Sequence, residues 1–149
     1  MRKYLLPIIG ACTMFANCAV FATSAQEENN KIIVMQFYKK AINERDFDAA
    51  EAYLGPRYIQ HNPLAKDGAE GLRTYIEYMK AAFPQSHSEI KRVLAEGDFV
   101  MLHVHSILEP GTLGNAVIDV FRLENNKIVE HWDVIQDITD HPENDNGMF

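Results

Sequence analysis

The amino-acid sequence predicts an α+β domain in which helices come first and strands follow. Residues 30–83 show helical hydrophobic periodicity, whereas residues 88–136 contain four runs rich in Val, Ile and Phe that are separated by turn signals. Helices followed by an antiparallel meander favour one curved sheet with helices packed on one face. The length of 149 residues suits a single domain, and 47% hydrophobic with 23% charged residues is typical of a globular chain.

The first 25 residues differ in character from the rest of the chain. Two basic residues precede an apolar run, and small residues then lead into a polar stretch. This order is typical of a cleaved secretory signal peptide, with cleavage after Ala25 or, as second choice, after Ala22. We therefore predict a signal peptide at 1–25 and one domain at 26–149. The protein would be periplasmic or secreted and would not remain in the membrane after cleavage.

Two other uses of this N-terminal segment stay open. A transmembrane anchor is disfavoured because Pro7 and Gly10 interrupt the apolar run and no basic stop-transfer cluster follows it. A lipoprotein is possible because a passable acylation box ends at Cys12, although the segment before it is short. Cys12 and Cys18 are the two cysteines of the chain, so the mature domain would have neither a disulfide nor a thiolate metal site.

The charge balance excludes several classes of partner. Loss of the signal peptide would leave 12 basic and 21 acidic residues, a net charge of −9. A surface this acidic repels phosphate backbones, so we expect no nucleic-acid partner. The sequence has no glycine-rich phosphate loop. We expect no cofactor.

Each helix is predicted from its apolar spacing and its end signals. Residues 30–43 form an amphipathic stripe, residues 47–54 follow the cap residue Asp46 and stop at a Gly-Pro pair, and residues 67–83 repeat apolar side chains up to Pro84. Between the last two helices, residues 57–63 should be extended, since a proline disfavours helix before it.

The strands are expected at residues 88–94, 99–108, 115–123 and 127–136. The last two should form a hairpin, because Asn125 and Asn126 tolerate the positive φ of a tight turn. Side chains alternate along a strand, so His103 and His105 share one face of their strand, opposite an apolar face formed by Val100, Leu102 and Val104.

The register of the hairpin decides where Asp119 lies. A two-residue turn would pair Asp119 with Trp132, whereas a bulged turn would bring it beside His131 and Asp133. A carboxylate in an apolar cavity has a raised pKa and can serve as an acid or base near neutral pH. The sequence leaves open whether these groups line a pocket or lie at the surface.

A metal site is a further use for several histidines. His103 and His105, together with His131 or Asp133, could supply three zinc ligands. No second spacing signal supports such a site, so we predict none.

Several segments together resemble the SnoaL-like polyketide cyclase family of the nuclear transport factor 2-like superfamily. They are Tyr58-Ile-Gln-His-Asn-Pro63, Gly71-Leu72, Glu96-Gly-Asp-Phe-Val100, Ile118-Asp-Val-Phe-Arg122 and Lys127-Ile-Val-Glu-His-Trp-Asp133. The resemblance covers residues 30–138 and implies a cone-shaped fold with about three N-terminal helices on a curved, mostly antiparallel four-stranded sheet. It also implies a homodimer and an acid/base role for Asp133. His103 and His105 stand where related epoxide hydrolases carry pocket Arg and Asp, which argues against epoxide hydrolysis.

The sequence is therefore consistent with two functions. The first is metal-independent acid/base catalysis of isomerase, cyclase or aldol type on a small, apolar, enolisable carbonyl compound. Its catalytic groups would be Asp133, His131 and His103, and its substrate-binding groups would be His61, His105, Asp119 and Tyr58. The second is a binding module that holds a small apolar metabolite without turnover. Either pocket requires His61, His103, His105 and Asp133 to converge within one cavity.

Overall fold

The structure is a computed structural model that describes residues 16–149, with side chains described from residue 25 onward. The predicted signal peptide at 1–25 therefore lies largely outside the described residues. The described part of the chain forms α1 (Ala16–Tyr38), a π-helical turn η1 (Lys39–Asn43), α2 (Phe47–Glu51), β1 (Leu54–Gln60), α3 (Gly68–Ala82), β2 (His87–Glu96), β3 (Phe99–Ile107), β4 (Asn115–Glu124) and β5 (Lys127–Asp137).

The helices and the last four strands confirm the predicted α+β class, but the described sheet has five strands instead of four. Their order is β1-β5-β4-β3-β2, with β1 parallel to β5 and the other pairs antiparallel. The extra strand begins at Leu54, which was predicted to end a helix, and includes residues expected only to be extended. β1 lies at the edge of the sheet, where Pro56 does not interrupt a ladder on both sides.

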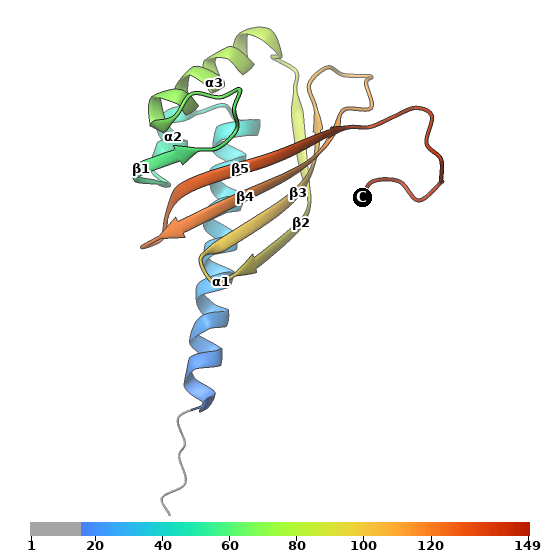
Figure 1. Cartoon of the computed structure of the whole chain (residues 1–149). Coiled ribbons are helices and arrows are strands. Elements are labelled where there is room, and N and C mark those ends of the chain that lie inside the picture. The colour runs from blue at the N-terminus through green and yellow to red at the C-terminus, as the bar shows by residue number, and fades with distance from the viewer. Residues whose placement is uncertain (1–15) are drawn as a thin grey trace, which may run out of the picture.

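The inner face of the sheet packs against the helices. α1 crosses behind β2 and β3 in Figure 1, and α3 lies over the end of the sheet near β1. Val100, Leu102 and Val104 are fully buried on this inner face, where they join Val34 and Phe37 of α1 in the core. Because the apolar face of β3 points inward, His103 and His105 point to the outer face.

The hairpin between β4 and β5 takes the bulged register. Asn125 and Asn126 both have positive φ, at 50° and 63°, as a tight two-residue turn requires. The register shifts between Arg122 and Leu123, and Asp119 pairs with Asp133 across the strands. This bulge places Asp119, His131 and Asp133 on the same inner face.

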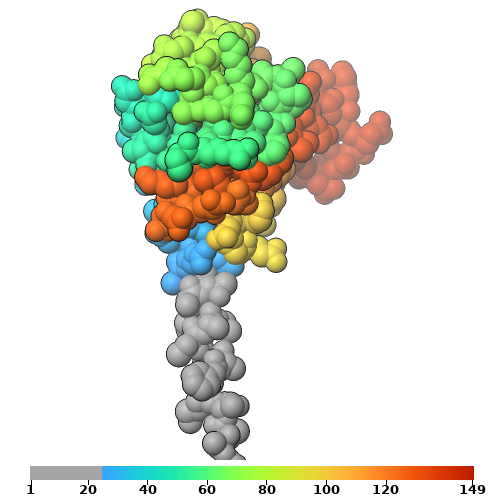
Figure 2. Space-filling model, turned by 60° about the vertical axis from the view of Figure 1, so that its left-hand side comes forward, coloured from blue at the N-terminus to red at the C-terminus, as the bar shows by residue number. Residues whose placement is uncertain are grey.

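α1 begins well before the predicted start at residue 30. Its side chains before residue 31 contact the turn between β2 and β3, since Gln26 Nε2 donates a hydrogen bond to Asp98 (2.6 Å) and Asn30 Nδ2 donates to the carbonyl of Gly97 (3.2 Å). Among the described helices, none is both long enough and apolar enough to cross a membrane. Figure 2 shows the end of the domain away from the N-terminus, where α3 and β1 form one surface above β5.

Candidate functional site

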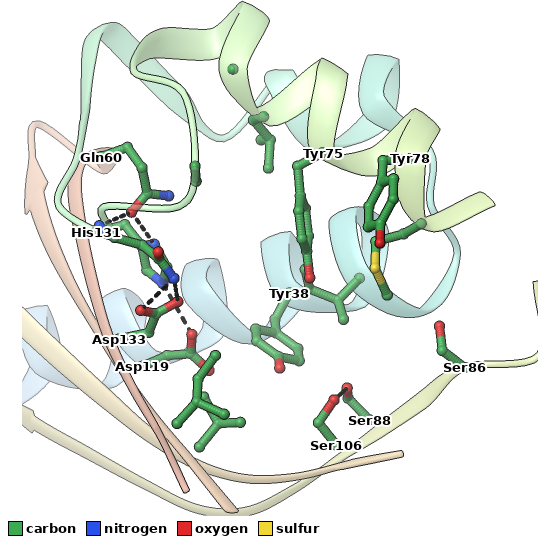
Figure 3. A pocket seen from close by; sticks show the side chains of 18 of the residues that line it. Tyr38, Gln60, Tyr75, Tyr78, Ser86, Ser88, Ser106, Asp119, His131 and Asp133 are labelled. Carbon is green, nitrogen blue, oxygen red and sulfur yellow. Dashed lines mark hydrogen bonds and ion pairs between the residues drawn. The ribbon is translucent and has the colours of Figure 1, made fainter. Parts of the chain in front are cut away.

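A cavity of about 350 Å³ lies between the inner face of the sheet, the end of α1 and the helix α3. Its apolar and aromatic walls come from the two helices, through Phe37, Tyr38, Leu72, Tyr75, Tyr78 and Met79. One end is polar and is formed by side chains of β1, β4 and β5, namely Tyr58, Gln60, Asp119, His131 and Asp133. Figure 3 shows this cluster facing the tyrosines across the cavity.

His131 connects two of these polar groups. Its Nε2 lies 3.0 Å from Asp119 Oδ1, and its Nδ1 lies 3.1 Å from Gln60 Oε1. Gln60 Oε1 also accepts a hydrogen bond from the backbone N–H of Asn62 at 2.8 Å, which fixes this oxygen as the acceptor. His131 Nδ1 must therefore carry a proton. One further proton then bridges Nε2 and Asp119.

This bridging proton determines the charge of the buried pair. If it resides on His131 the pair is an imidazolium with a carboxylate, and if it resides on Asp119 the pair is a neutral imidazole with a carboxylic acid. The net charge is zero in both cases. Asp119 and His131 are only 5% and 8% exposed, and a neutral pair avoids the cost of an uncompensated buried charge.

Asp119 has an environment that opposes ionisation. Burial raises its pKa above the ordinary value, the hydrogen bond and positive charge of His131 oppose that shift, and the nearby charge of Asp133 raises the pKa further. Within the described residues its Oδ2 atom is buried without a hydrogen-bond partner. Asp119 thus lies at the buried end of the cavity lining, where His131 is its hydrogen-bond partner.

Asp133 is the carboxylate that opens to the cavity. Asn62 Nδ2 donates to both of its oxygens, at 2.8 and 2.9 Å. Asn62 Oδ1 accepts from the backbone N–H of Leu64 at 2.8 Å, so the orientation of the amide is fixed. Asn62 therefore holds Asp133 in place while leaving it only partly buried.

Three phenols complete the polar lining of the cavity: Tyr38 and Tyr58 are buried, and Tyr75 is partly exposed. Burial is the main cause that raises the pKa of Tyr38, Tyr58 and Tyr75, and the negative charge of Asp119 adds to each shift. These phenols remain protonated at neutral pH, so they can donate hydrogen bonds to an oxygen that gains negative charge.

The predicted convergence of His61, His103, His105 and Asp133 is wrong. Of these four described residues, Asp133 alone lines the cavity. His103 lies 2.9 Å from Arg92 and His105 lies 2.8 Å from the carbonyl of Leu113, on the outer face. The physical reason is that the apolar face of β3 packs under the helices, which turns both histidines outward.

His61 also lies outside the cavity. Its ring stacks on Trp132 with centroids 4.4 Å apart, and its Nε2 is 3.6 Å from Glu130. By contrast, the predicted residues Tyr58, Asp119, His131 and Asp133 do line the cavity.

The zinc alternative cannot form as described, because His103 and His105 lie on the opposite face from His131 and Asp133. A different trio, Asp119, His131 and Asp133, offers ligand atoms that all lie within 4.8 Å of one another. A cation would have to lie about 2.0–2.2 Å from each ligand atom. The bridging proton and Asn62 already engage atoms that such an ion would need.

Gln60 and Asn62 are site residues that sequence reasoning missed. Tyr58, Gln60 and Asn62 alternate along one face of the chain, whereas His61 falls on the other face. The alternation itself was the signal, but residues 57–63 were not treated as a strand.

A family model for the SnoaL-like polyketide cyclase matches residues 32–141, which include every residue of the polar cluster. The chain belongs to this family. The match confirms the resemblance to this family that the sequence showed, and the matched residues make up most of the chain. No curated protein sequence matches this chain with statistical significance.

Solved structures share the fold of this SnoaL-like protein at low identity. TsrD from Streptomyces laurentii has a TM-score of 0.61 and 22% identity, covering 72% of this chain and 88% of its own. A putative polyketide cyclase from Bacillus cereus has a TM-score of 0.63 and 19% identity, covering 72% and 74%. IdmH, a putative polyketide cyclase from Streptomyces antibioticus, has a TM-score of 0.59 and 18% identity, covering 71% and 91%. These likenesses identify the cone-shaped nuclear transport factor 2-like fold.

Proposed function

We propose that this SnoaL-like protein is an acid/base enzyme acting on a small, largely apolar, enolisable carbonyl compound, in a reaction of isomerase, cyclase or aldol type. One observation carries the proposal: a carboxylate, Asp133, opens into an apolar cavity directly beside a buried pair that already shares one proton. No metal is required for this chemistry.

Asp133 is the proton acceptor in this proposal. Its carboxylate removes a proton from the carbon next to the substrate carbonyl, and the C–H electron pair moves into the enolate. A neutral phenol, Tyr58 or Tyr38, donates a hydrogen bond to the oxygen that gains negative charge. The proton on Asp133 then returns to a different carbon, or the enolate carbon attacks a second carbonyl whose oxygen takes that proton.

Asp119 and His131 have a supporting role. Asp119 Oδ2 is buried and Oδ1 is bonded to His131, so Asp133 is the more accessible of the two carboxylates. The pair stays neutral wherever its proton resides and leaves Asp133 as the negative charge beside the reacting carbon. His131 is a positioning residue in this proposal because both of its nitrogens are already engaged.

The test is turnover of a panel of enolisable ketones and lactones by the wild type and Asp133→Asn. The amide keeps an oxygen that can accept from Asn62 but cannot take a proton. We expect kcat/KM to fall by about 10²–10⁴-fold. His105→Gln is the matched control, because it changes a polar side chain on the outer face, and its activity should equal that of the wild type.

A binding module is the second candidate function. Its support is that both nitrogens of His131 are bonded and that Asp119 is buried and bonded to His131, so little of the polar cluster is available for proton transfer. If no compound is turned over above background and Asp133→Asn makes no difference to any of them, the binder replaces the enzyme.

We also propose a homodimer formed through the outer face of the sheet. Val100, Leu102 and Val104, the apolar face of β3, pack under the helices of the same chain and are not part of the proposed dimer surface. The outer face nevertheless exposes Phe99 at 45% and Val134 at 70%. Light scattering of the mature protein at tens of micromolar should give twice the monomer mass, and a monomer would end the claim.

Export remains a proposal based on the N-terminal sequence. Cleavage after Ala25 would cut within α1 and leave the contact between Gln26 and Asp98 intact. Intact-mass analysis of protein exported by a bacterial host should find a chain that starts at or near Gln26. A chain that stays in the membrane with lipid on Cys12 would contradict soluble export.

A further inference from the structure

The cavity has a second polar end that the proposed chemistry does not use. Ser86, Ser88 and Ser106 line it, and Figure 3 shows them on the far side of Tyr38 from the carboxylates. Ser88 Oγ and Ser106 Oγ are 3.2 Å apart. The two polar ends are separated by the aromatic and apolar walls that the helices provide.

Arg45 determines the hydrogen-bonding role of Ser86 at this end of the cavity. Its guanidinium donates to Ser86 Oγ at 2.7 Å and also to the carbonyls of Ser86 and Pro84. Arginine has no acceptor, so Ser86 Oγ accepts this bond and its own hydroxyl proton remains free to donate. Ser88 Oγ donates to Ser106 Oγ, so the hydroxyl proton of Ser106 is likewise left to donate. The serine end therefore offers two O–H donors.

The backbone of Ser88 is held by Asn43, the last residue of η1. Asn43 accepts from the N–H of Ser88 and donates to its carbonyl, both at 2.9 Å. Asn43 ends the π-helical turn η1, and Arg45 has a positive φ of 54°. Both features are uncommon in chains of L-residues and are often found at functional sites. Here Asn43 contacts the start of β2 at Ser88, and Arg45 contacts the loop before β2 at Pro84 and Ser86.

The charge at this end has a definite sign. The guanidinium of Arg45 lies directly behind Ser86, and within residues 25–149 its buried Nε has no hydrogen-bond partner. Its positive charge lowers the pKa of the neighbouring Tyr75, although burial raises that pKa overall. A positive charge behind two O–H donors favours a ligand oxygen that accepts hydrogen bonds and disfavours an ammonium group.

We propose that the substrate is bifunctional, with an enolisable carbonyl at the Asp133 end and a second, hydrogen-bond-accepting oxygen held by Ser86 and Ser106. This oxygen belongs to a carbonyl, an ester or a carboxylate. The inference rests on the proposed acid/base function for the first group, whereas the second group is recognised through binding alone.

The test is a matched ligand series in which only the group opposite the ketone changes. Acetophenones that carry a para methyl, acetyl, carboxylate or aminomethyl group share one body, and their dissociation constants are measured by calorimetry. The acetyl or carboxylate compound should bind about tenfold tighter than the methyl compound, the size of one gained hydrogen bond. Comparison of these two separates a neutral oxygen from an anionic one. The aminomethyl compound should bind no tighter than the methyl compound.

Variants then assign the effect to the serines. Ser86→Ala and Ser106→Ala should each reduce the advantage of the acetyl or carboxylate group, while Ser106→Thr, which keeps a hydroxyl, should restore it. Thr74→Val is the matched control, since it removes an exposed hydroxyl on α3. Thermal unfolding of each variant verifies that it is folded, and the Thr rescue keeps the test valid if an Ala variant is unstable.

The outcomes are distinct from those of the catalytic test. Four equal dissociation constants, absence of binding by all four compounds at millimolar concentration, or tightest binding by the aminomethyl compound would overturn the bifunctional substrate. Oxygen selectivity that depends on the serines, combined with no effect of Asp133→Asn on turnover, would instead support this binding site and reject the acid/base function.

Discussion

The two faces of the sheet carry the same residue types in two different states. On the inner face, His131 and Asp119 are buried, and both nitrogens of the histidine are bonded. On the outer face, His103 and His105 are only partly buried, and their partners are Arg92, the carbonyl of Leu113 and the ring of Phe149. Burial on the inner face makes the loss of a hydrogen-bond partner costly, while solvent on the outer face can replace a lost partner.

The difference explains why chemistry is expected on one face alone. Ion pairs on the outer face, such as Arg122 with Glu130 and Glu124, contribute little to stability, because water screens them. On the inner face water cannot replace a lost partner, so removal of one group leaves another unpaired. The predictions below compare matched changes on the two faces.

The largest effect is expected for His131→Leu. It leaves Asp119 buried without its partner, and loss of one member of a buried pair costs about 3–5 kcal/mol. The matched outer-face change, His103→Leu, should alter the free energy of unfolding by about 0.5 kcal/mol or less. Urea denaturation monitored by the fluorescence of Trp132 measures both values.

A double variant separates the unpaired charge from the loss of packing. If the unpaired charge is the cause, Asp119→Leu combined with His131→Leu should recover much of the stability lost in His131→Leu alone. Equal destabilisation by the single and double variants would show that the stacking of His131 on Phe121 matters more.

A smaller effect is expected for Gln60→Leu. The side-chain oxygen of Gln60 accepts from His131 Nδ1 and from the backbone N–H of Asn62, so leucine leaves two donors without their acceptor. The cost should be about 1–3 kcal/mol if these donors stay buried. Gln85→Leu changes an exposed glutamine and should have almost no effect on the denaturation midpoint. A neutral outcome for Gln60→Leu would remove the basis for assigning a proton to Nδ1.

Asp119→Asn should stabilise the protein, with a dependence on pH. Burial raises the folded-state pKa of Asp119 above its ordinary value of 3.8. The contribution of Asp119 to the free energy of unfolding is therefore fully present below pH 3.8, and it is lost as the pH rises through the raised pKa. The variant has no carboxyl to ionise and can donate its amide proton to His131 Nε2.

The melting temperatures of the wild type and Asp119→Asn should thus be similar near pH 3.5 and should diverge as the pH rises, with the variant higher by a few degrees at pH 7. Asp98→Asn, on an exposed turn, serves as the control. A variant that is less stable than the wild type at pH 7 would mean that His131 keeps Asp119 ionised at a net gain.

Local sequence signals predicted much of this fold but could not assign the faces. The last four strands follow from alternation and turn residues, and α3 starts after Asp67 as expected. β1 was missed because its partner, β5, is about 70 residues away and parallel pairing has no local signature. The carboxylate of Asp67 shows the same limit, since it accepts from the backbone N–H of Gln60 and does not cap its own helix.

The candidate site was predicted where it depends on the hairpin of β4 and β5, and it was missed where it depends on packing. Asp133, His131 and Asp119 were identified as polar residues within apolar strands, and the bulge that unites them was one of two registers considered. His103 and His105 carried an equally strong signal. Nothing local states which face of β3 the helices cover, and that choice alone sends the two histidines outward.

The smallest effect is expected for removal of Phe149, which tests the outer face itself. The Phe149 ring lies 5.1 Å from the ring of His103 and 4.8 Å from that of His105, and Lys91 Nζ is 5.6 Å from its centre. These contacts are solvent-exposed, so a chain ending at Met148 should lose about 0.5 kcal/mol or less and keep full activity on any substrate found. Equilibrium denaturation and kcat/KM measure the two quantities, with Leu64→Ala as a control for loss of an exposed apolar side chain that lies away from these histidines. A large loss of activity on removal of Phe149 would mean that the outer histidines influence the site, and the contrast between the two faces would fail.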